Sequence, residues 1–289
     1  MKQMDEFTAI MKARTFVNKV NPSAVPVSVE AYAAELSARV KYDKTMSAEE
    51  DGCSTFFNGK LVIAVNGNHR QERQRFTICH EVAHAVLGLP SEHDAASWSY
   101  AKRPPNEVIC DAFAAELLLP FSLFKPHVEK SDIGFTAVEA LANLFEASLA
   151  ATASRFATVT SAPCAYVLSE GGKVRYCARS KALREAKAWI PLGVVLAERS
   201  LTARLRGGEA CQGPQEIAAD IWFSDWQRGG ELLEDSRYHS PWDQGLSLVW
   251  FEDEEVPEQT NSEQRLTFEN DGLAELDGVL PWPGRSRRR

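Results

Sequence analysis

The stretch Phe76–Gly88 reads F-T-I-C-H-E-V-A-H-A-V-L-G, and its residues His80-Glu81-Val82-Ala83-His84 match the pattern H-E-x-x-H. On an α-helix, residues four apart share a face, so His80 and His84 can hold one ion between them. Zinc binds imidazole nitrogen, and a catalytic zinc site has three protein ligands and one water molecule. Glu81 directly follows the first histidine, so its carboxylate can reach that water and take its proton. The motif therefore predicts two metal ligands and a general base.

The residues around the motif favour a helix. Apolar side chains recur at helical spacing: Ile78, Val82, Ala85, Val86 and Leu89. Gly88 and Pro90 supply a stop signal. The alternative is an amphipathic core helix in which the histidines are incidental, but their buried polar atoms would then need other partners. We therefore favour the metal site.

A second helical pattern, Asn106–Pro120, is expected to supply the third ligand. Glu107 and Asp111 lie four residues apart and share a face of this helix. One carboxylate can bind the metal, while the other can accept the free N–H of a ligand histidine. Glu116 is the competing candidate ligand, but it follows Glu107 by about 2.5 turns and so faces away from it.

Two resemblances bear on this choice. The spacing H-E-x-x-H followed by E-x-x-x-D resembles that of the thermolysin-like zinc peptidases, which implies that Glu107 is the ligand and Asp111 supports a ligand histidine. More specifically, R-F-T-I-C-H-E-V-A-H-A-V-L-G followed by N-E-x-x-x-D-A-F-A-A-E-L-L-L-P resembles the ImmA/IrrE family of bacterial zinc peptidases. This resemblance covers about Val29–Leu123 and weakens beyond Phe156. It implies an enzyme that cleaves a helix-turn-helix transcriptional repressor and so switches on a stress response or mobile-element genes.

Composition restricts the function further. The chain has 289 residues, enough for two or three small domains, and its net charge of −8 argues against a general nucleic-acid binder. No apolar run is long enough to cross a membrane. Met1–Phe7 lacks the apolar core of a signal peptide, so a cytoplasmic protein is expected.

The six cysteines form no C-x-x-C pair, which is typical of reduced thiols in a reducing compartment. Cys79 and Cys110 each stand beside a predicted site residue. Thiolate ligation of zinc is an alternative there. Because neighbours on a helix point about 100° apart, we expect both to pack as small apolar groups.

The predicted architecture is α+β and begins with a zincin-like metallopeptidase domain over residues 1–128. Helices are expected at Met4–Val20 and Val29–Val40, and Asn58-Gly59 is a strong hairpin signal. Leu61–Asn66 is the clearest strand of this half. It is either a core strand or the strand that pairs with extended substrate.

Residues 129–160 are expected to form a small helical unit that resembles a helix-turn-helix. Thr136–Glu139 is a capping box for its first helix, and Ser148 is the expected cap of its second. A helix that reads DNA should carry donors and positive charge, but Leu149–Thr160 offers only Arg155. We therefore expect a structural or repressor-contacting unit, and no direct DNA binding.

Residues 161–255 predict a C-terminal α+β domain. Cys164–Ser169 and Lys173–Arg179 form a hairpin pattern, Pro214–Gln227 has a helical stripe, and Gly245–Glu252 is a strong strand. Some members of the resembled family carry a GAF-like domain here that is suspected of sensing. The tryptophans of this region are more typical of a core than of a ligand cage.

The last part, residues 256–289, is rich in acids and ends in arginines, and we expect a flexible tail. In the polar loop between the two ligand helices, His93, Tyr100 and Arg103 are alternative donors to the oxyanion of peptide attack. The sequence does not choose among them.

The sequence thus predicts a cytoplasmic zinc metalloendopeptidase, with manganese as an alternative metal, held by His80, His84 and Glu107. Glu81 is the general base, Asp111 supports a ligand histidine, and the resemblance implies a helix-turn-helix repressor as substrate. Two other classes of protein remain open. One is a binding module that sequesters a repressor or antitoxin without cutting it. The other is a transcription regulator with a vestigial peptidase fold.

Overall fold

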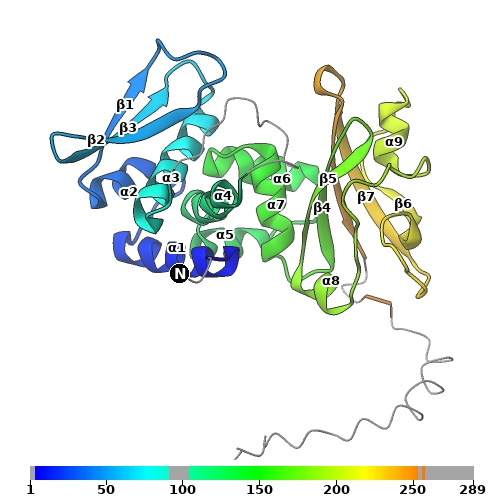
Figure 1. Cartoon of the computed structure of the whole chain (residues 1–289). Coiled ribbons are helices and arrows are strands. Elements are labelled where there is room, and N and C mark those ends of the chain that lie inside the picture. The colour runs from blue at the N-terminus through cyan, green and yellow to red at the C-terminus, as the bar shows by residue number, and fades with distance from the viewer. Residues whose placement is uncertain (1–3, 91–103, 253–255, 258–289) are drawn as a thin grey trace, which may run out of the picture.

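The computed structural model describes residues 4–90, 104–252 and 256–257. The N-terminal part contains α1 (Glu6–Val20), α2 (Val29–Glu35), β1 (Arg39–Asp43), β2 (Gly52–Phe57), β3 (Lys60–Asn66) and α3 (Gln71–Leu87). Four further helices follow: α4 (Pro105–Leu118), α5 (Phe121–Val128), α6 (Phe135–Phe145) and α7 (Leu149–Val159). These helices lie between a small sheet at one end of the molecule and a larger sheet at the other (Figure 1).

The C-terminal part is built on the larger sheet. Its strands are β4 (Cys164–Glu170), β5 (Lys173–Arg179), β6 (Gln215–Ala218), β7 (Glu231–His239) and β8 (Gln244–Trp250). Its helices are α8 (Lys181–Glu185), α9 (Leu201–Arg206) and the 3-10 turns η2 (Ala219–Ile221) and η3 (Ser240–Trp242). The strand order is β5-β4-β8-β7-β6, and every neighbouring pair is antiparallel. The predicted α+β class and the hairpin of β4 and β5 are confirmed.

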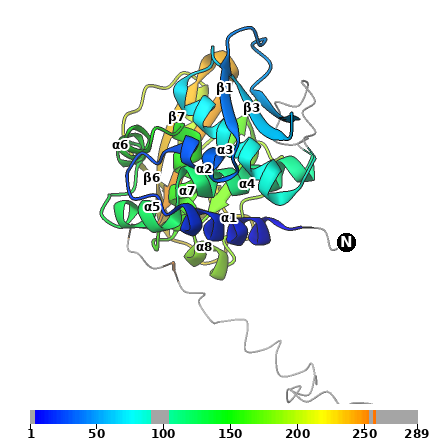
Figure 2. The same cartoon turned by 90° about the vertical axis from the view of Figure 1, so that its left-hand side faces the viewer.

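The small sheet has the order β1-β3-β2, so β3 is its central strand. β1 runs parallel to β3, and β2 pairs with β3 as the predicted antiparallel hairpin. Both edges of β3 are therefore occupied, so of the two alternatives for Leu61–Asn66 the structure favours a core strand over a strand that pairs with substrate. Figures 1 and 2 both show α3 between this sheet and α1.

Two predicted helices differ from the structure. The helix that begins at Val29 ends at Glu35 rather than Val40, because Arg39–Asp43 pairs with β3 instead. Pro214–Gln227 is not a helix: Gln215–Ala218 forms β6 against β7, followed by the turn η2. In both places a strand partner distant in sequence satisfies the backbone, which local helical patterning cannot foresee.

The helix-turn-helix-like pair is α6 and α7. Ser148 caps α7 as expected, with its side chain accepting a hydrogen bond from the Ala151 amide. The capping box at Thr136–Glu139 is wrong, because α6 already begins at Phe135. Its first amide donates to Asp235 Oδ2 on β7 at 2.7 Å, so a strand of the C-terminal sheet caps this helix.

The two faces of the larger sheet belong to two apolar cores. Tyr166, Leu168 and Leu248 face the helices and join a core that extends to Ala9 in α1. Val167 and Val249 face the other way, into a smaller core beneath α8 and η2. The larger core thus includes α1–α7 and one face of the sheet. The predicted domain boundaries at residues 128, 160 and 255 stay a prediction. The predicted tail, residues 256–289, lies outside the described residues apart from residues 256–257.

No helix in the described part of the chain is both long and apolar enough to cross a membrane.

Candidate metal centre

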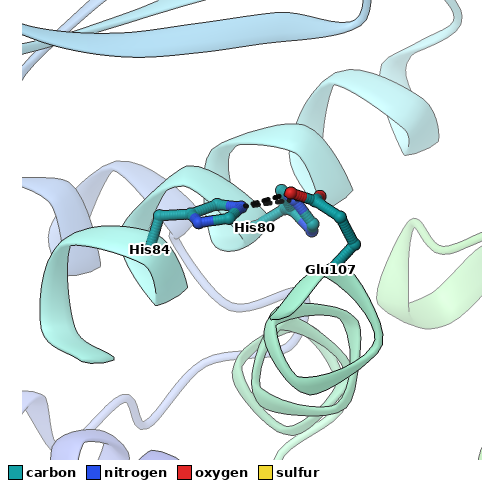
Figure 3. A group of neighbouring side chains, drawn as sticks. All are labelled: His80, His84 and Glu107. Carbon is teal, nitrogen blue, oxygen red and sulfur yellow. Dashed lines mark hydrogen bonds and ion pairs between the residues drawn. The ribbon is translucent and has the colours of Figure 1, made fainter. Parts of the chain in front are cut away.

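His80 and His84 lie one turn apart on α3, and Glu107 reaches toward them from the first turn of α4 (Figure 3). All three are buried. His80 Nε2 lies 3.0 Å from His84 Nε2 and 3.0 Å from Glu107 Oε2, and His84 Nε2 lies 3.5 Å from Glu107 Oε1. Among the described residues, these are the ones whose potential ligand atoms gather within 4.8 Å of one another.

The partners of the other ring nitrogens fix where the protons lie. His80 Nδ1 is 3.0 Å from Asp111 Oδ1, and His84 Nδ1 is 3.1 Å from the carbonyl oxygen of Leu89. A carboxylate and a carbonyl can only accept hydrogen bonds, so each Nδ1 carries a proton and donates. In the neutral imidazole, each Nε2 then presents a bare lone pair.

The positions of these lone pairs indicate whether a metal ion fits the site. Two bare imidazole nitrogens and a carboxylate oxygen converge in a buried space, where mutual repulsion is poorly screened. One cation shared among the three atoms satisfies all of them at once. Ligands bound about 2.0–2.1 Å from zinc at tetrahedral angles lie about 3.3 Å apart, close to the separations found here. The two histidines and Glu107 are therefore a donor set that could hold a metal ion, and their spacing fits one of the size of zinc.

The sequence did not foresee the carbonyl of Leu89 as the partner of His84. The signal for it was present in Gly88, which adopts a left-handed conformation with φ of 65°. The amide of Leu89 then bonds to the His84 carbonyl, and the chain turns back so that the Leu89 carbonyl reaches the imidazole. A helix stop signal therefore also orients a ligand.

Glu81, the residue after His80 on α3, is only 1% exposed. Burial, followed by the negative charges of Glu81 and Glu50, raises the pKa of the Cys53 thiol on β2. Burial, followed by the charges of Glu107 and Glu81, raises the pKa of Cys110 on α4 to about 12. The carboxylate of Glu81 is thus close enough to act on both β2 and the helix that carries Glu107.

The cysteines beside the site have the properties of apolar packing groups. Cys79 and Cys110 are fully buried in the larger core. Burial raises the pKa of Cys79 to about 12, so this thiol remains protonated at neutral pH. Neither sulfur joins the three ligand atoms. The expectation that both pack as small apolar groups is consistent with these positions.

Glu116, the competing ligand candidate, is used elsewhere. Its buried carboxylate pairs with Arg155 of α7 and with Arg14 of α1 at 3.3 Å. It also accepts the amide of Phe121 at 2.8 Å. Arg155, the one basic residue considered for DNA contact, is therefore held inside the helical core. Glu116 ties together helices that support α4 and takes no part in the metal cluster.

The replacement Asp111→Asn is expected to keep the fold and to weaken metal affinity or activity about 10–100-fold. The amide can still accept from His80 Nδ1, but it lacks the charge that makes His80 a better ligand. Metal titration against a competing chelator measures the effect. Unchanged affinity would show that the contact between Asp111 and His80 does not tune the site.

Glu116→Gln makes the same chemical change, carboxylate to amide, about 1.4 turns further along α4. Here we expect metal binding to be kept and stability to fall. Metal content should stay at the wild-type level. The free energy of unfolding should fall by roughly 3 kcal/mol, because the guanidinium of Arg155 loses its buried counter-charge. Urea unfolding of both proteins checks this. Loss of metal without loss of stability would instead return Glu116 to the ligand set.

The predicted oxyanion donors His93, Tyr100 and Arg103 lie outside the described residues.

Comparison with known proteins finds a metalloprotease among the relatives of this part of the chain. Residues 33–157 match the model of the IrrE N-terminal-like domain, Peptidase_M78. The radiation response metalloprotease IrrE of Deinococcus radiodurans is 31% identical over 117 residues, which cover 39% of this chain and 35% of the relative. The match thus spans about a third of the relative's length.

A solved structure shares the fold over a longer part of the chain. It is a Mycobacterium tuberculosis transcriptional regulator, with a TM-score of 0.58 over 86% of this chain and 77% of that chain. Sequence identity is only 10%, so the likeness concerns the fold alone.

Proposed function

We propose that this protein, whose residues 33–157 belong to the ImmA/IrrE metallopeptidase family, is a zinc-dependent endopeptidase that cuts a helix-turn-helix repressor. One observation carries the proposal. Potential ligand atoms of His80, His84 and Glu107 lie within 4.8 Å of one another, and Asp111 and the Leu89 carbonyl orient the two imidazoles. A buried glutamate, Glu81, directly follows His80. A metal site with an adjacent carboxylate is suited to hydrolysis.

Each residue of the site would have its own role in peptide hydrolysis. A zinc ion at this position would polarise the peptide carbonyl and acidify a water molecule. The carboxylate of Glu81 would take the proton of the attacking water and pass it to the leaving amine. Asp111 would hold His80 in the tautomer that offers Nε2, and the Leu89 carbonyl would do the same for His84.

β2 is the strand best placed to hold an extended substrate. It pairs with β3 on one side, and within the described residues no strand pairs with its other edge. The strand lies against α3: a Cβ added at Gly52 would come within 2.6 Å of Thr77 Cγ2. A peptide added to this edge would gain main-chain hydrogen bonds whatever its side chains, and it would run close to Glu81.

The proposed substrate class and biological role come from the resemblance to the ImmA/IrrE family. The Deinococcus relative is named as a radiation response metalloprotease. Cleavage of a repressor would allow transcription of the genes that it represses, as a stress response requires. Cytoplasmic location belongs to the same proposal, because a transcriptional repressor acts at DNA.

The direct test uses the purified chain, a helix-turn-helix repressor encoded beside it, and zinc or manganese. We expect a single cut in the repressor, identified by mass spectrometry, and no cut when a chelator is present. Stable binding of an intact repressor by the metal-loaded protein would instead favour sequestration.

A further inference from the structure

A cavity of about 200 Å³ lies on the side of the C-terminal sheet that faces away from the metal centre. Its walls come from β5, from the loop before α9 and from the segment around η2. Most of the lining is apolar: Val174, Ile190, Leu196, Ile221, Trp222 and Phe223. None of these residues belongs to the metal centre.

Backbone hydrogen bonds join the segments that line the cavity. The amide of Val174 donates to the Val194 carbonyl at 2.9 Å, and the amide of Gly193 donates to the Val174 carbonyl at 2.7 Å. The amide of Ser224 donates to the carbonyl of Trp189 at 2.9 Å. These contacts fix the lining segments relative to one another, and small-molecule sites are usually preformed in this way.

The floor is anchored by a buried carboxylate. Trp222 donates its indole N–H to Glu234 Oε2 at 2.9 Å, and Glu234 is fully buried. The same carboxylate accepts the amides of Leu201 and Thr202 at the start of α9, each at 2.9 Å. The indole N–H of Trp222 therefore already has a hydrogen-bond acceptor in Glu234. An occupant of the cavity would contact the apolar part of the Trp222 ring.

Large apolar side chains are exposed to solvent at and beside the cavity. Val195 is 71% exposed and Val194 is 42% exposed, and Leu192 beside them is 60% exposed. Among the described residues that line the cavity, Asp220 is the only charged one, and it is exposed. This carboxylate disfavours an anionic occupant and favours a cationic one.

We propose that this cavity binds a small neutral or cationic molecule with an apolar body about the size of one ring. A cavity of about 150 Å³ lined by apolar side chains can hold benzene, so the space here suits a ring with a short substituent. The ring would lie against Trp222 and Phe223, and an amine on the substituent would lie near Asp220. The proposal does not depend on the peptidase function.

The test titrates the full-length protein with 2-phenylethylamine, and separately with phenylacetate, by isothermal calorimetry. We expect saturable binding of the amine with a Kd of about 1 mM or lower, as a ligand of this size permits. Phenylacetate should bind at least about 10-fold more weakly, because its carboxylate meets Asp220. Asp220→Asn should remove most of that difference.

Val194→Trp supplies the blocking variant, since its larger ring can fold into the cavity from the rim. We expect it to abolish binding of the amine. Met11→Trp is the matched control, because Met11 is 44% exposed and lies on α1, remote from this cavity. Circular dichroism shows that each variant is folded. Wild-type protein that binds neither probe, or equal binding by Val194→Trp and Met11→Trp, would overturn the proposal. If Val194→Trp fails to fold, unchanged discrimination in Asp220→Asn would overturn it.

Discussion

Replacement of Glu81 by glutamine is expected to abolish repressor cleavage while the protein keeps its metal and its fold. The substitution removes a negative charge but hardly changes the volume of a side chain that is 1% exposed. His80, His84 and Glu107 are untouched, so the cluster of ligand atoms remains. What is lost is the acceptor for the proton of the attacking water, and general-base help typically contributes about 10²–10⁴-fold.

The measurement is the rate of repressor cleavage by metal-loaded wild-type and variant protein at equal concentration. Glu72→Gln, the same change in the first turn of α3, is the control and should cleave at the wild-type rate. A reporter strain then separates proteolysis from sequestration. A protease with Glu81→Gln binds the repressor but leaves it active. Relief of repression at the wild-type level by the metal-loaded variant would show that binding alone is the function.

His84→Ala is expected to lose the metal. The imidazole supplies one of three ligand atoms, and its removal leaves His80 and Glu107 as an incomplete set. The loss of affinity should exceed the roughly 10–100-fold that a supporting residue such as Asp111 controls. Activity should disappear with the metal. Elemental analysis of the purified proteins measures metal per chain, with one ion expected in the wild type.

His239→Ala is the matched control, because it removes the same side chain from an exposed position at the end of β7. It should retain one metal per chain. The thermal midpoint gives a second readout: a chelator should lower it in the wild type and in His239→Ala, but not in His84→Ala, since a ligand bound only to the folded state stabilises that state. Equal metal content in wild type and His84→Ala would remove His84 from the ligand set.

The local chemistry of the site could be predicted from the sequence because it depends on helical periodicity. Four-residue spacing places His80 beside His84, and it places Asp111 one turn beyond Glu107. The end of α3 at Gly88 and the cap of α7 at Ser148 are equally local, since each follows from the backbone preferences of one residue. These features need no knowledge of what packs against the helix.

Other features depend on partners that are distant in sequence. Asp235 caps α6 from 100 residues away, and Val40 and Ile217 lie in strands because β3 and β7 offer them backbone partners. Periodicity within a segment cannot reveal such a partner, and a paired strand outweighs a local helical preference of a few tenths of a kcal/mol per residue.

The sequence by itself determined the metal-binding helix, its two histidines, the adjacent glutamate and the α+β class. It also favoured Glu107 over Glu116 as the third ligand, but only the tertiary structure showed what each of these carboxylates meets. α4 crosses α3 so that its first turn meets the histidines, while its last turn meets Arg155 and Arg14. The tertiary structure also decided that β3 is covered on both edges and β2 on one. The physical reason is the same in both cases. Helical spacing determines which side chains share a face, but what that face meets depends on how elements far apart in the chain pack together.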